Sequence, residues 1–149
     1  MDIRIISVTS ENYKDILNLK IFEHQSNFIE TTEQCLKEAE ELSLWKPVGI
    51  YVDNVLIGFS MYGKFQNEGT DGRVWLDRFL IDKGYQGRGY AKPVLISLIK
   101  LIKSEYNCSE IYLSIYDNNI MAVCLYKNLG FNFNGELDIN GEKVMILKL

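Results

Sequence analysis

The chain has 149 residues, of which 47% are hydrophobic and 24% charged, a balance typical of one soluble globular domain. Its formal net charge of −4 argues against a general nucleic-acid binder, and no apolar run approaches the roughly 20 residues that span a bilayer. Because the first residues also lack a signal-peptide pattern, we expect a single cytoplasmic domain over residues 1–149, without a nucleic-acid or membrane partner.

The amino-terminal half of the chain predicts a strand, two helices and a hairpin. Residues 3–8 alternate loosely as a strand, and Ser10 is placed to cap the helix that follows. The segment 31–34, Thr-Thr-Glu-Gln, fits a capping box at the start of a second helix. Two β-rich runs then flank Asp53-Asn54, a pair that favours a tight hairpin turn.

From residue 74 onwards, strands and helices alternate. The expected elements are strand 74–81, helix 88–104, strand 109–116, helix 119–129, and strands 131–138 and 142–148 around Asn140-Gly141. The whole order, β-α-α-β-β-β-α-β-α-β-β, predicts a single α/β domain with a mixed sheet. The first two of these strands should be joined by a right-handed crossover.

Residues 85–91, Tyr-Gln-Gly-Arg-Gly-Tyr-Ala, join the end of a strand to the start of a helix. Such a turn directs several free backbone N–H groups and the positive end of the helix dipole at one point, which favours a phosphate. No Gly-Lys-Ser/Thr follows, so this is no Walker A loop. Lys92 occupies the third glycine position of a dinucleotide fingerprint, so that interpretation is also disfavoured. The alternative is that the glycines only permit the turn.

A second pattern places Asn119, Ala122 and Tyr126 on one face of a helix, followed by Gly130-Phe131. A small residue at position 122 lets a ligand approach the helix, and Tyr126 would present its phenol beside that ligand. The alternative is that Tyr126 is one of nine tyrosines and simply half-buried.

Together the two patterns resemble the signatures of the GNAT superfamily of N-acetyltransferases, and the expected order of elements agrees with it over the whole chain. The resemblance implies the GNAT fold, with a sheet that splays open between strands 74–81 and 109–116. It also implies acetyl-CoA as cosubstrate, with its pantetheine arm in that gap, its pyrophosphate on the loop amides and its sulfur near Tyr126. The residues so implied are Phe79, Leu80, Ile81, Gln86, Gly87, Arg88, Gly89, Tyr90, Ala91, Asn119 and Tyr126.

The implied reaction is direct attack of an amine on the thioester in a ternary complex. A primary amine has a pKa of about 10, so a carboxylate or a water chain must take its proton. Tyr126 is suited to protonate the departing thiolate, because a phenol also stays protonated at neutral pH. Either Glu30 or Asp77 is a candidate for the general base.

The acceptor is indicated by further segments, among them 28–32, 46–49, 73–79 and 135–138, which resemble the bacterial spermine/spermidine (diamine) N-acetyltransferases. Residues 21–45 also hold six Glu and one Lys, which suits a polycation but also a solvated helix face. The candidate acceptor contacts are Glu23, Glu30, Glu33 and Asp77, with Asp77 expected on one strand face together with Trp75 and Phe79.

Other functions remain open from sequence alone. The alternative acceptors are a protein N-terminus, a lysine and an aminoglycoside, and the alternative to an enzyme is a non-catalytic acyl-CoA-binding regulator. Three cysteines, odd in number and far apart, favour reduced thiols, and a single histidine makes a metal site improbable. A homodimer is compatible with the sequence but not indicated by it.

Overall fold

The structure is a computed structural model that describes all residues except Asn27 and Ile29. Ile29, part of the segment 28–32 used above, therefore lies outside the described residues. The elements are β1 (Ile3–Ser7), α1 (Tyr13–Leu17), η1 (Glu23–Gln25), α2 (Thr32–Glu41), β2 (Trp45–Val52), β3 (Val55–Phe65), β4 (Arg73–Ile81), α3 (Ala91–Tyr106), β5 (Glu110–Ile115), α4 (Ile120–Asn128), β6 (Asn132–Leu137) and β7 (Lys143–Lys148). The expected α/β order is confirmed, with one added 3-10 turn.

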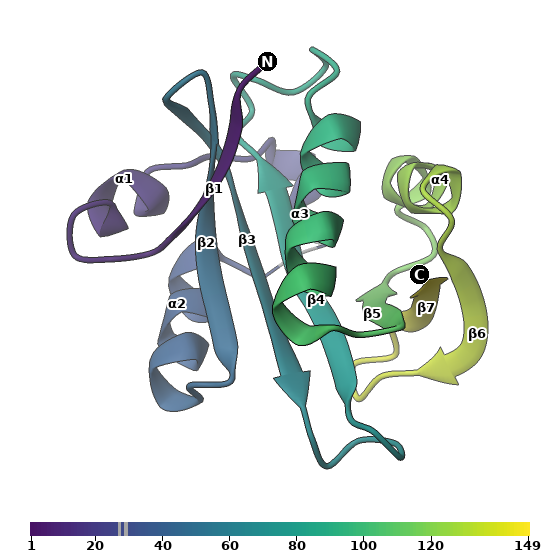
Figure 1. Cartoon of the computed structure of the whole chain (residues 1–149). Helices are drawn as coiled ribbons and strands as arrows, with labels where there is room; N and C mark the ends of the chain where they lie inside the picture. The colour runs from purple at the N-terminus through teal and green to yellow at the C-terminus, as the bar shows by residue number, and fades with distance from the viewer. Residues whose placement is uncertain (27, 29) are drawn as a thin grey trace.

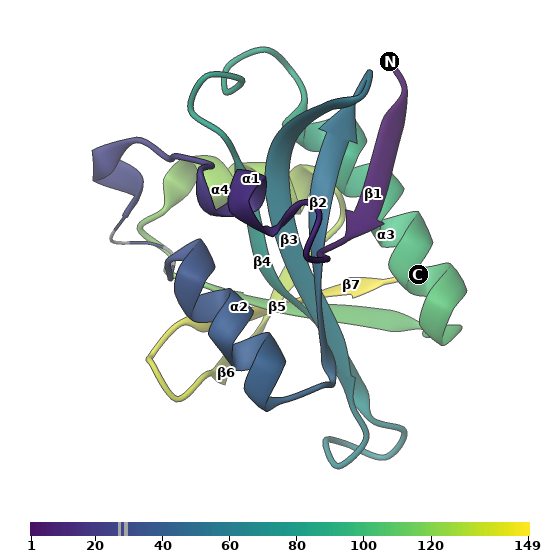
Figure 2. The same cartoon turned by 90° about the vertical axis from the view of Figure 1, so that its left-hand side faces the viewer.

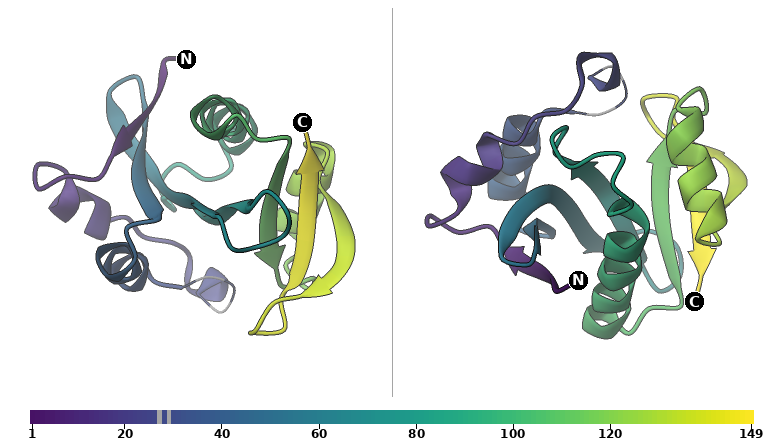
Figure 3. Two further views of the ribbon diagram at one scale, coloured as in Figure 1. Left: turned by 60° about the horizontal axis from the view of Figure 1, so that its bottom comes forward. Right: turned by 90° about the horizontal axis from the view of Figure 1, so that it is seen from above.

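One seven-stranded sheet runs through the molecule in the order β1-β2-β3-β4-β5-β7-β6. Neighbouring strands are antiparallel except β4 and β5, which are parallel and share a single Cα pair, Trp75 with Tyr112. That pair lies near the start of both strands, so the strands separate toward their carboxyl ends. Figure 3 shows the two halves of the sheet as two walls on either side of this opening.

Helices cover both faces of the first wall, with α1 and α2 on one side and α3 on the other (Figures 1 and 2). The core beneath α3 contains Leu95, Leu98 and Ile102 of that helix, and α4 packs against the same cluster. A second core lies beneath α1 and α2 around Ile16 and Leu36. In the described part of the chain, no helix is long and apolar enough to cross a membrane.

A β-bulge in β4 changes which side chains share a face. Met61 pairs with Arg78 and Tyr62 with Leu76, which leaves Asp77 as an extra residue on β4. Leu76 therefore joins the core beneath α3, whereas Leu80 joins the core beneath α1 and α2. The expectation that Trp75, Asp77 and Phe79 lie on one face is wrong, because it assumed unbroken alternation.

Ser10 does not cap the first helix as expected, because α1 begins at Tyr13 with Asn12 as its N-cap residue and no side-chain cap hydrogen bond. The turn signals at residues 31–34 and 53–54 are confirmed. Asp53 and Asn54 both have positive φ, as the tight hairpin requires, and Gln34 completes the capping box with Thr31. The helix expected from residue 88 begins only at Ala91, because the glycine loop extends further than predicted. The last hairpin turns through residues 139–141, with Gly141 in the left-handed region.

Candidate active site

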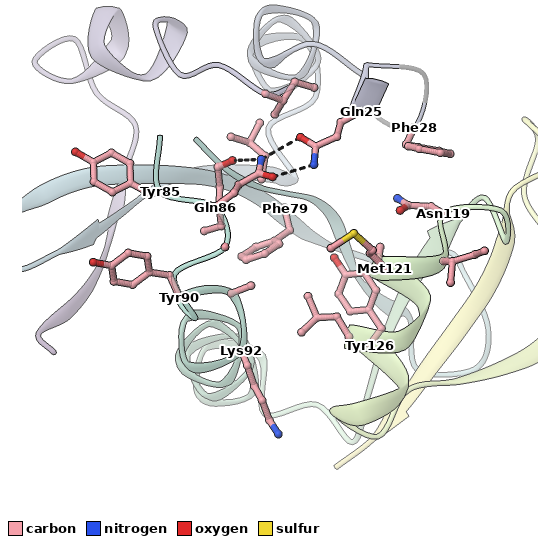
Figure 4. Close-up of a pocket in the computed structure, with 18 of the residues that line it drawn as sticks. Gln25, Phe28, Phe79, Tyr85, Gln86, Tyr90, Lys92, Asn119, Met121 and Tyr126 are labelled. Atoms are coloured by element: carbon pink, nitrogen blue, oxygen red, sulfur yellow. Dashed lines mark hydrogen bonds between the residues drawn. The ribbon is translucent and has the colours of Figure 1, made fainter. Parts of the chain in front are cut away.

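A cleft of about 610 Å³ opens between the end of β4, the loop that precedes α3, and α4 (Figure 4). The apolar walls come from Phe79, Leu80 and Ile81 on one side and from Ala122 and Leu125 on the other. The segment that contains η1 contributes a third wall. The cleft therefore follows the gap that the diverging strands β4 and β5 leave in the sheet.

The loop at the mouth of this cleft exposes backbone donors. Gly87 and Gly89 have φ of +75° and +81°, which only glycine adopts readily. Apart from the adjoining residues, no atom of the described chain lies within 4 Å of where their Cβ atoms would stand. The loop leads directly into α3, whose positive dipole end adds to the attraction for an anion. Among the described residues, the free amides of 86–92 donate to no other group of the protein. The loop is thus ready to hold a phosphate.

The side chain of Gln86 lines the cleft and also stabilises the loop through hydrogen bonds. Its Nε2 donates to the carbonyl oxygen of Ile81 at 2.8 Å. It also exchanges two hydrogen bonds with Gln25, at 2.9 and 3.0 Å, so the amides of the two glutamines pair (Figure 4). The sequence did not indicate Gln25, which ties η1 to the glycine loop.

The basic side chains near the loop have other contacts. Arg88 lies over the Tyr85 ring, 5.5 Å from its centroid, and does not line the cleft. Lys92 does line the cleft, but its Nζ donates to Asn128 Oδ1 at 2.6 Å. Phosphate recognition would therefore depend mainly on the backbone, as the loop pattern predicts.

Tyr126 and Asn119 stand where the cleft meets a second cavity, and both line the two spaces. Tyr126 packs edge-on against Phe131, with 5.6 Å between ring centroids, which fixes the direction of its phenol. Burial raises the pKa of Tyr126 above its ordinary value. The phenol therefore stays protonated at neutral pH and is available as a donor.

The second cavity has a volume of about 280 Å³ and an acidic lining. Glu30, Asp77 and Glu142 contribute carboxyl groups from three separate parts of the chain, and Ser114 and Arg78 also line it. Five residues belong to both spaces: Phe28, Phe79, Asn119, Ala122 and Tyr126. A ligand in the cavity and a ligand in the cleft would thus meet beside Tyr126.

Two carboxyl groups of this cavity, those of Asp77 and Glu142, have raised pKa values. Loss of hydration raises the pKa of Asp77 to about 6, with the neighbouring Glu30 adding to the rise. Burial likewise raises the pKa of Glu142 to about 7, with Asp138 as a second cause. Such groups can change protonation state during a reaction near neutral pH, which is expected of a base or a cation site.

Glu142 was not among the residues that the sequence indicated. It lies at the end of the β6–β7 turn, where its backbone N–H donates to Asp138 Oδ1 at 2.8 Å. Pairing of β5 with β7 brings this turn to β4, far away in sequence. No local pattern near residue 142 reports that contact, so only the topology could have revealed it.

Two predicted acceptor residues lie elsewhere. Glu33 is exposed on the outer side of α2, and its carboxylate is 3.9 Å from Lys37 Nζ. Glu23 is exposed on η1. Neither lines the two described cavities, so of the four acidic candidates only Glu30 and Asp77 are brought together.

Comparison with known sequences identifies the relatives of this chain. The sequence profile described as "Acetyltransferase (GNAT) family" matches residues 10–131. A protein of Bacillus subtilis (strain 168), described as "Spermine/spermidine N(1)-acetyltransferase", is 49% identical over 152 residues, which cover 100% of both chains.

Comparison of structures gives the same fold at much lower sequence identity. An aminoglycoside acetyltransferase, AAC(6')-Ib, in complex with coenzyme A superposes with a TM-score of 0.81 at 16% identity, covering 99% of this chain and 95% of the other. A spermidine N-acetyltransferase from Vibrio cholerae, in complex with CoA and spermine, gives 0.74 at 19% identity, covering 98% and 95%. These likenesses concern the fold.

Proposed function

Because this chain belongs to the acetyltransferase (GNAT) family, we propose that it transfers the acetyl group of acetyl-CoA to a primary amine of a polyamine such as spermine or spermidine. The full-length relative at 49% identity supports this choice of acceptor. The observation that carries it is the cavity lined by three carboxyl groups, which joins the cleft at Tyr126.

The cleft has the properties that a coenzyme A ester needs. The loop of Gly87 and Gly89 offers unpaired amides and open space for a pyrophosphate. The apolar walls on β4 and α4 suit a long, narrow arm. When bound, acetyl-CoA supplies an activated acetyl thioester and a thiol leaving group. The residues of the protein bind the amine and transfer the protons.

The acceptor cavity has the properties that a chain of cations needs. Carboxylates placed apart along a wall attract successive ammonium groups, and Phe28 and Phe79 can cover the methylenes between them. The nitrogen that reacts must reach the region beside Tyr126, where the two spaces join.

The chemical roles follow from the charges of these groups. Asp77 or Glu30, acting directly or through a water molecule, takes a proton from the bound ammonium group so that the nitrogen has a free electron pair. The nitrogen forms its bond to the acetyl carbonyl carbon as the carbon–sulfur bond breaks. Tyr126 holds its proton at neutral pH and donates it to the departing sulfur, and the second proton that the nitrogen loses on becoming an amide restores the phenol.

A panel of acceptors tests the proposal. CoA release is measured with acetyl-CoA and, in turn, spermine, spermidine, putrescine, an aminoglycoside and an N-terminal peptide. We expect the highest kcat/KM with spermine or spermidine. A preference for the aminoglycoside or the peptide would replace the proposed acceptor. Binding of acetyl-CoA without turnover on any amine would point instead to a regulatory acyl-CoA binder.

A further inference from the structure

Arg78 is buried beneath the acceptor cavity, next to the bulge in β4. Its residue is 5% exposed, although arginine is rarely buried without a partner. Ser60 Oγ donates a hydrogen bond to the backbone carbonyl of Arg78, which ties β3 to β4 at the bulge. The backbone of Arg78 is therefore held in place at the bulge, and its guanidinium is within range of the charges of Cys35 and Glu38 on α2.

This buried cation lacks the partner that would ordinarily compensate it. In the described part of the chain, Nε of Arg78 has no hydrogen-bond partner. Nor does any carboxylate oxygen there lie within the 4.0 Å that defines an ion pair with it. Burial of a charge costs free energy unless it is offset, and here the offset must come from charges slightly further away.

Acidic groups surround Arg78 on several sides. Glu38 and the buried Cys35 face it from α2, Glu30 from the segment before α2, and Asp77 from β4. The thiol of Cys35 is close to a carboxylate oxygen of Glu30, at 3.9 Å, and its pKa is raised to about 12, so it carries no charge near neutral pH. From the β6–β7 turn, Asp138 acts on Asp77.

We propose that Arg78 is a positioning residue for the acceptor cavity, which keeps Asp77 charged and available to an incoming ammonium group. In this role, which rests on the proposed function, Arg78 acts on the amine through the carboxyl groups of the cavity that it lines. Without it, three neighbouring acids would repel one another, and the least hydrated would become neutral. Arginine suits this role better than lysine because a guanidinium keeps its proton even when burial lowers its pKa.

The charge balance gives the sign of the effect. The guanidinium lowers the pKa values of Asp77 and Glu38, against the rise that burial causes. Replacement by an uncharged side chain of similar length removes that effect, so Asp77 becomes neutral at a higher pH. A neutral Asp77 attracts a cation less, so the affinity for a polyamine should be lost earlier as the pH falls.

The test is the pH dependence of the apparent KM for spermine in the full-length protein. In Arg78→Met, KM for spermine should begin to rise at a pH about one unit higher than in the wild-type protein, with KM for acetyl-CoA unchanged. Arg78→Lys should return the profile toward wild type. Because the pKa of Glu38 is itself raised to about 7, this group is largely neutral on the acid side, and Glu38→Gln should leave the profile close to that of the wild-type protein.

Arg73→Met is the matched control, because it also removes a cation from β4. Arg73 pairs with Glu136 and lines neither described cavity. This control should leave the spermine profile in place. An unshifted profile in folded Arg78→Met, or equal shifts in Arg73→Met and Arg78→Met, would overturn the positioning role. If Arg78→Met does not fold, a wild-type profile in which KM for spermine does not rise on the acid side would overturn the positioning role. Absence of turnover with spermine in the wild-type protein would instead contradict the proposed function.

Discussion

The two halves of the site are built in different ways. The cleft is made mostly of backbone and apolar side chains from consecutive elements, namely β4, the glycine loop and α3, closed by α4. The acceptor cavity is made of carboxyl groups from three distant parts of the chain, at residues 30, 77 and 142. Substitutions should therefore affect the two halves independently, except at the residues that both share.

That difference explains how selectivity would arise. A backbone cradle recognises a phosphate by its donors and therefore varies little with side-chain identity. A cavity of carboxyl groups depends on each side chain and on its charge state, so it can be adapted to a particular amine. The following substitutions test whether the two halves are separable.

The largest expected effect is at the junction, in Tyr126→Phe. Loss of a proton donor to the leaving sulfur should lower kcat roughly a hundredfold, because general acids typically contribute at least that much. KM for acetyl-CoA should change little, since the ring still packs against Phe131. CoA release under saturating substrates is the measurement, and an unchanged kcat would exclude the donor role.

A smaller effect, confined to the cleft, is expected in Gly89→Val. A β-branched residue at φ +81° is strained, and its side chain would enter the space of the phosphate, so the Kd for acetyl-CoA should rise about thirtyfold. Gly135→Val is the control, because it carries similar strain at φ +89° in β6, outside both described cavities. Equal weakening of acetyl-CoA binding in both variants would mean that only stability was affected.

Effects confined to the acceptor cavity should follow in Asp77→Asn and Glu142→Gln. Each removes one charge-assisted contact and should raise KM for spermine about tenfold, with KM for acetyl-CoA unchanged. Glu33→Gln, on the outer side of α2, should behave as wild type. A rise in KM for spermine in Glu33→Gln equal to that in Asp77→Asn would argue for general surface attraction instead of a defined cavity.

The smallest effect is that of pH on the unmodified protein. The carboxyl groups of Asp77 and Glu142 have pKa values raised to about 6 and about 7, so they gain protons as the pH falls through this range. KM for spermine should then rise about threefold between pH 7 and pH 6, whereas KM for acetyl-CoA should stay level. Steady-state rates across this range measure both, and a parallel change of the two constants would contradict separable halves.

The same difference sets how much of the molecule could be predicted from its sequence. Hydrophobic periodicity and turn residues are local, and they correctly predicted the order of strands and helices. The loop of Gly87 and Gly89 is also a local pattern, and the structure gives both glycines the positive φ that such a turn needs. This side of the cleft was accessible to sequence reasoning because β4, the glycine loop and α3 are neighbours in the chain, whereas the wall that contains Gln25 was not.

The acceptor cavity was predicted less well because its parts are not neighbours. Glu142 reaches it through strand pairing between β5 and β7, which no local pattern encodes. The bulge at Asp77 broke the alternation expected for β4, and one extra residue moves later side chains to the other face. Glu33 was selected by composition alone, and its place on the outer side of a helix makes it a solvated charge.

One comparison tests the central claim most directly: the kcat/KM of the wild-type protein for spermine against that for butylamine, which has one amine and no further charge. If the carboxyl groups of the cavity recognise a polycation, spermine should be favoured at least tenfold. The double variant Asp77→Asn/Glu142→Gln should lose most of that preference. Equal kcat/KM for the two amines in the wild-type protein would contradict a polyamine site in this cavity.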